Sequence, residues 1–79
     1  MKFFTDGYGH VARVHTDTLF GPDFGTAKAQ TYRAGHNDWR DGGPGLTSEL
    51  RFSGDWEPCS DDDAAALMAA ARQAHRQLV

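Results

Sequence analysis

The stretch SDDDAAALMAAARQAHRQLV at residues 60–79 has the composition and the end signals of one α-helix. Ser60 stands just before the first turn, where its hydroxyl can accept a hydrogen bond from a free backbone N–H. Asp61, Asp62 and Asp63 fill the first turn, where the helix dipole favours carboxylates. Alanine, the residue with the highest helix propensity, then occupies seven positions. The sequence therefore predicts a C-terminal helix over 60–79 that is capped at Ser60.

One face of this helix is apolar and narrow. At about 100° per residue, its members are Ala64, Leu67, Ala71, Ala74 and Leu78. Because alanine is small, the helix can approach a sheet closely, and the two leucines can anchor it. We expect this face to pack on one side of a β-sheet.

The first part of the chain predicts a β-hairpin. Lys2–Thr5 is a short strand, Tyr8–Thr16 is the return strand, and Asp6-Gly7 between them is typical of a two-residue turn. The next segment is punctuated by glycine and proline and predicts a loop. Its large apolar side chains are expected to point inward: Leu19, Phe20 and Phe24.

Two further segments predict strands. Ala27–Ala34 alternates with moderate β propensity, and Leu46–Ser53 alternates clearly, with Leu50 and Phe52 on the same face. Residues 35–45 between them are rich in glycine and predict a loop of about ten residues. A loop this long in a small domain is often functional.

These elements together predict an α+β fold, with a small antiparallel sheet of three or four strands and the C-terminal helix packed on one face. The 79 residues form a single domain, residues 1–79. So small a domain leaves little room for an active-site cavity, and we do not expect an enzyme. A lone cysteine excludes an internal disulfide, and neither a signal peptide nor a membrane span is expected, which favours the cytoplasm.

Charge is unevenly distributed along the chain. Residues 1–51 carry six basic and six acidic side chains, whereas residues 52–79 carry two basic and five acidic ones, which accounts for the net charge of −3. Phosphate binding depends on clustered Lys and Arg, and the sequence has no such cluster. Direct binding to nucleic acid is therefore not expected.

The histidines and the cysteine do not form a recognisable site. His10 and His15 have opposite parity on a strand, His36 lies in a loop and His75 on the helix, so no metal-ligand spacing is present. Cys59 precedes the helix, but the aspartates that follow should raise its pKa, and we expect it to pack rather than to react. The sequence predicts no catalytic residue, no metal and no cofactor.

Two groups of residues remain as candidate contacts for a partner. The glycine-rich loop and its flank supply aromatic and arginine side chains, the types that dominate interface hot spots: Tyr32, Arg33, Trp39 and Arg40. Trp39 is either an exposed anchor or a plug folded onto the sheet. The second group is an acidic patch that can meet basic residues of a partner: Asp55, Glu57, Asp61, Asp62 and Asp63.

The whole chain resembles the small phage-borne anti-CRISPR proteins, and specifically inhibitors of the type I-C system. The resemblance runs from the opening MKFFTDGYG to the closing helix SDDDAAALMAAARQAHRQLV. It implies binding to a subunit of the crRNA-guided surveillance complex (Cascade) in the host bacterial cytoplasm, and a block of target DNA recognition. An alternative is a small regulatory nucleic-acid-binding module that gathers its scattered arginines by forming an oligomer.

Overall fold

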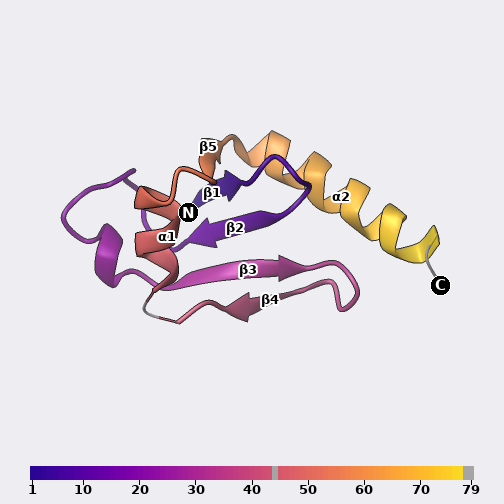
Figure 1. Cartoon of the computed structure of the whole chain (residues 1–79), viewed down its shortest axis with the longest axis horizontal. Coiled ribbons are helices and arrows are strands. Elements are labelled where there is room, and N and C mark those ends of the chain that lie inside the picture. The colour runs from indigo at the N-terminus through magenta and orange to yellow at the C-terminus, as the bar shows by residue number, and fades with distance from the viewer. Residues whose placement is uncertain (44, 78–79) are drawn as a thin grey trace.

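An antiparallel sheet of five strands, in the order β4-β3-β2-β1-β5, forms the centre of the computed structural model (Figure 1). The model describes residues 1–43 and 45–77. The strands are β1 (Lys2–Thr5), β2 (Val11–Val14), β3 (Ala29–Arg33), β4 (Asp38–Asp41) and β5 (Glu57–Cys59). The α+β class is confirmed, although the sheet has five strands and not three or four.

The two faces of the sheet follow from its register. Phe4, Ala12 and Thr31 pair across β1, β2 and β3, and their side chains share one face, the core face. The residues next to them in the strands, which include the paired Phe3 and Arg13, point their side chains to the opposite face, the outer face. Most large apolar side chains lie on or against the core face.

The helices lie on opposite faces of this sheet. The helix α1 (Leu46–Phe52) packs on the core face together with the short 3-10 helix η1 (Phe24–Thr26). The helix α2 (Asp61–Gln77) lies on the outer face. Among the described residues, no helix is both long enough and apolar enough to cross a membrane.

The prediction of a strand at Leu46–Ser53 is wrong, because this segment forms α1. The helix places Leu46 and Leu50, four residues apart, side by side over the core face, where they are 6% and 2% exposed. Phe52 would share their face in a strand, yet it is 73% exposed at the helix end. The alternating pattern is ambiguous here, since leucines four residues apart also fit a helix.

The prediction of one long loop over residues 35–45 is also wrong. Residues 38–41 form β4, which pairs with β3 through a short turn. Two cross-strand pairs stabilise this hairpin: Arg33 with Asp38, and Tyr32 with Trp39. In the turn, Asn37 adopts a positive φ of 50°, which asparagine tolerates better than most residues.

The strand β5 was not expected from the sequence. It pairs with β1 at the edge of the sheet, where Pro58 is tolerated because its missing N–H costs no bond to a further strand. The segment therefore joins α1 on the core face to α2 on the outer face.

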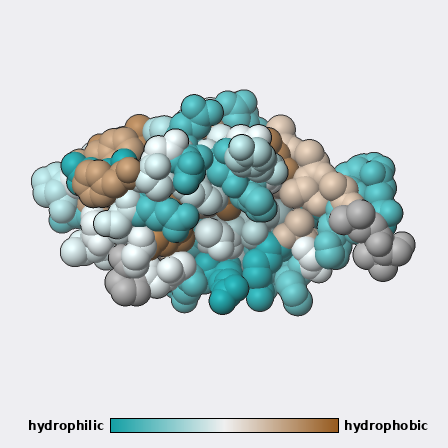
Figure 2. All heavy atoms as spheres, viewed as in Figure 1, coloured by the Kyte–Doolittle hydropathy of each residue, from teal (hydrophilic) through white to brown (hydrophobic). Residues whose placement is uncertain are grey.

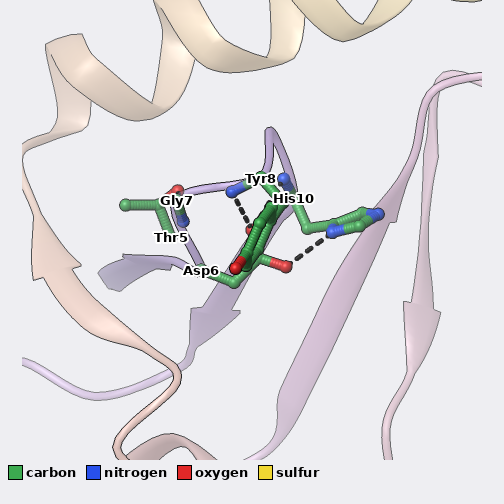
Figure 3. Close-up of polar contacts among 5 residues, drawn as sticks. All are labelled: Thr5, Asp6, Gly7, Tyr8 and His10. Carbon is green, nitrogen blue, oxygen red and sulfur yellow. Dashed lines mark hydrogen bonds and ion pairs between the residues drawn. The ribbon is translucent and has the colours of Figure 1, made fainter.

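The first hairpin has a longer turn than the two-residue one predicted, because β2 begins only at Val11. Figure 3 shows the Asp6 carboxylate accepting a bond from the Tyr8 N–H at 2.8 Å and contacting the His10 ring. Burial raises the pKa of Asp6, but these bonds outweigh it and hold the pKa below its usual value. Gly7 supplies a positive φ of 80°.

The C-terminal helix is confirmed over Asp61–Gln77, and residues 78–79 lie outside the described chain. Ser60 caps it, because its Oγ accepts a bond from the Asp63 N–H at 3.0 Å. Ala64 is fully buried, and Leu67 and Ala71 are half-buried against the outer face. Ala74 is exposed, contrary to expectation, because the last turns project beyond the strands (Figure 1).

The loop after the first hairpin is only partly turned inward. Phe24 is 1% exposed and belongs to the core, as predicted, whereas Leu19 and Phe20 are 44% and 38% exposed. Near them, the Arg51 guanidinium lies over the rings of both Phe20 and Phe52. Figure 2 shows hydrophobic surface at this end of the molecule, near α1.

Candidate functional site

The four residues predicted as a partner-binding loop lie on the β3–β4 hairpin, but on two faces. Tyr32 and Trp39 pair across the strands and point to the outer face. Arg33 and Arg40 have the opposite parity and point to the core face. The structure therefore brings together only the two aromatic residues of this group.

Arg33 is held within its own hairpin. Its Nε and Nη2 donate to the two carboxylate oxygens of Asp38, at 2.7 and 2.6 Å. These side-chain bonds raise the pKa of Arg33 and lower the pKa of Asp38. Arg40 is exposed, and no carboxylate of the described residues lies within 4.0 Å of it. Arg33 is thus a structural residue, and Arg40 is the free arginine of the pair.

Of the two alternatives for Trp39, the structure is closer to a plug folded onto the sheet than to an exposed anchor. It is half-buried on the outer face, where the Arg13 guanidinium lies 4.1 Å from its ring centroid. The rings of Tyr32 and Phe3 lie 5.3 and 6.3 Å away. The sequence reasoning missed Phe3 and Arg13, which only the register of β1 and β2 against the hairpin would have indicated.

A buried glutamine fixes the arginine in this arrangement. Gln30 is 7% exposed, and its Oε1 accepts bonds from Arg13 Nε at 2.7 Å and from His15 Nε2 at 3.0 Å. The Gln30 amide donates to Asp41 at 2.9 Å. Because Arg13 Nε can only donate, Oε1 is the acceptor, and His15 Nε2 must carry its hydrogen.

The resulting surface is called the aromatic–arginine platform below. Its residues come from four strands: Phe3, Arg13, Gln30, Tyr32 and Trp39. The bond from Gln30 and the charge of Lys28, 3.6 Å away, hold the pKa of Asp41 below its usual value at the rim. On the α2 side, Arg72 Nη1 donates to the Tyr32 hydroxyl at 3.1 Å.

The acidic group lies on β5, on the turn before it and on the first turn of α2. It is called the acidic edge below: Asp55, Glu57, Asp61, Asp62 and Asp63. All five side chains are exposed, and none has an ion-pair partner among residues 1–43 and 45–77. These five carboxylates are therefore accessible at the surface.

Cys59 shows that carboxylates of the acidic edge gather in one place. Burial raises the pKa of its thiol, and the charges of Asp63, Glu57 and Asp61 raise it further. A groove of about 400 Å³ between β5 and α2 is lined partly by Glu57, Cys59 and Asp63. A raised thiol pKa disfavours the reactive thiolate, which agrees with a packing role for Cys59.

The two predicted groups lie at opposite edges of the sheet. The strand β4 forms one edge and β5 the other, with three strands between them. At about 4.8 Å per strand, the separation is roughly 19 Å. The acidic edge and the β3–β4 hairpin are therefore two surfaces and not one site.

Comparison with known proteins does not assign a function. No family model, curated protein or solved structure matches the chain. Within the described part of the chain, no three His, Cys, Asp or Glu side chains come close enough to hold a metal ion.

Proposed function

We propose that the protein is a non-catalytic inhibitor that binds the type I CRISPR surveillance complex (Cascade) in the host cytoplasm and blocks recognition of target DNA. The observation that carries this proposal is the acidic edge, with its five exposed carboxylates that no ion pair neutralises in the described structure. The resemblance of the sequence to phage inhibitors of the type I-C system suggests the partner.

The physical argument is one of competition for cations. A complex that binds DNA presents Lys and Arg side chains to the phosphates. Four of the five carboxylates of the acidic edge are held on regular structure, since β5 pairs with β1 and Ser60 caps the first turn of α2, while Asp55 lies on the turn before β5. Presenting fixed carboxylates reduces the ordering cost of binding. The remainder of the domain would then exclude DNA sterically.

A plaque assay tests the inhibitor proposal. The protein is expressed in cells that carry an active type I-C system, and phage plaques are counted against the same cells without the protein. We expect the count to rise toward that of a strain lacking the complex. Unchanged immunity in every type I subtype tested would refute the proposal.

A pair of matched variants tests the contact surface. The first removes three charges from the acidic edge: Asp55→Asn, Glu57→Gln and Asp62→Asn. The control removes three charges elsewhere on the surface: Asp17→Asn, Asp23→Asn and Glu49→Gln. We expect only the first to lose pull-down of the purified complex, while thermal melts confirm that both are folded. Equal binding by both variants would exclude the acidic edge as the contact.

A further inference from the structure

We propose that the aromatic–arginine platform is a second binding site, and that it takes a short segment of single-stranded nucleic acid. This inference goes beyond the inhibitor function, because it concerns the outer face and not the acidic edge. The sequence did not lead us to expect contact with nucleic acid, since its arginines are scattered along the chain. The fold brings the relevant side chains together.

The platform is an open surface. The helix α1 lies on the other face of the sheet, and α2 lies over the part of the outer face near the hairpin turns, next to Tyr32. Phe3, Arg13 and Trp39 are half-buried, so each keeps accessible surface. The three side chains pack against one another: the Trp39 ring lies beside the Phe3 ring and against the Arg13 guanidinium.

Arg13 is held ready for an anion. Its Nε is committed to Gln30, and its guanidinium carbon lies 4.1 Å from the Trp39 ring centroid. No carboxylate of the described residues lies within 4.0 Å of it, and burial lowers the pKa of Arg13. Its Nη groups therefore remain for an external acceptor, and a guanidinium fork matches a phosphate in geometry.

The charge of the surface points to the same class of ligand. Arg13 within the platform, and Lys28 and Arg72 beside it, stand against the carboxylate of Asp41, and these four described side chains have a formal charge of +2. The chain as a whole carries −3. The Asp41 carboxylate is already bonded to Gln30 and lies 3.6 Å from Lys28. The platform is thus a cationic region on an acidic protein.

The rings favour nucleic acid over an acidic peptide. Tyr32, Trp39 and Phe3 form a continuous strip across the sheet, with ring centroids 5.3 and 6.3 Å apart. Proteins bind single strands by stacking bases on such rings while cations track the backbone. An acidic peptide would use the cations but would have no corresponding use for the strip.

Fluorescence anisotropy with a labelled oligothymidine of about ten nucleotides tests the proposal on the full chain. We expect binding at low salt, with a slope of log affinity against log salt of roughly −1.4 to −2 for two or three phosphate contacts. A duplex of the same length and a polyglutamate peptide serve as competitors. Absence of oligothymidine binding, or preferred binding of polyglutamate or of the duplex, would overturn the proposal.

Three single variants locate the site. Arg13→Gln should weaken binding by about tenfold, as expected for the loss of a charged hydrogen bond. Lys28→Gln, at a more exposed position, should leave the fold intact and reduce the salt slope by about 0.7. The control is Arg40→Gln on the core face, which should bind like the parent protein. Equal losses at Lys28 and Arg40 would refute the platform as the site.

Discussion

Replacing Leu50 and Phe52 by alanine, one at a time, tests the helix α1 directly. In a strand the two side chains would share one face and one environment, whereas in the helix Leu50 is 2% exposed and Phe52 is 73% exposed. Leu50→Ala should therefore cost about 3 kcal/mol of unfolding free energy, within the range for buried leucines. Phe52→Ala should cost less than about 1 kcal/mol, the upper value for an exposed contact such as that with Arg51.

Thermal and urea denaturation, followed by circular dichroism, measure both costs. A chain of this length has about 4–12 kcal/mol of stability, so the Leu50→Ala variant should remain folded at low temperature. Its Tm should fall by about 12–24 °C, and that of Phe52→Ala by less than about 8 °C. Equal losses for the two variants would mean that residues 46–53 form a strand, and the placement of α1 would be wrong.

Two further predictions concern the start of α2. Ser60→Ala removes the acceptor of the Asp63 N–H and should lower the unfolding free energy by about 1 kcal/mol in urea melts, whereas Ser48→Ala, at an exposed position, should not. Cys59 should react with iodoacetamide at neutral pH more slowly than a free cysteine, because burial and the neighbouring carboxylates raise its pKa. Asp63→Asn should speed this reaction, and a rate that is unchanged would contradict the electrostatic part of the explanation.

The helix α2 was predictable because its signals are local. A cap, an acidic first turn and a run of alanines act within a few residues, and none of them depends on the rest of the fold. The strand β4 has no comparable signal, since DWRD is polar and becomes a strand through its partners on β3. The strand β5 depends in the same way on the edge of β1.

The candidate sites also depend on residues that are distant from one another in the sequence. Tyr32 and Trp39 were identified by residue type, but the side chains that complete the platform, Phe3, Arg13 and Gln30, are 9 to 36 positions away from Trp39 in the sequence. Only the strand order and the register place them together. The same strand order places the acidic edge and the β3–β4 hairpin at opposite edges of the sheet, a separation that the sequence alone does not indicate.

Charge counted along the sequence also conceals the charge of a surface. Residues 1–51 sum to zero, which argued against a ligand that carries phosphates. In the fold, however, Asp38 pairs with Arg33 and Asp41 with Lys28, so these four side chains contribute no net charge. Arg13 is left without a carboxylate partner among the described residues, and it lies on the face that also carries the rings. Neutrality of the segment and a cationic platform are therefore compatible, because the charge that a ligand meets depends on which side chains share a face and not on their sum along the chain.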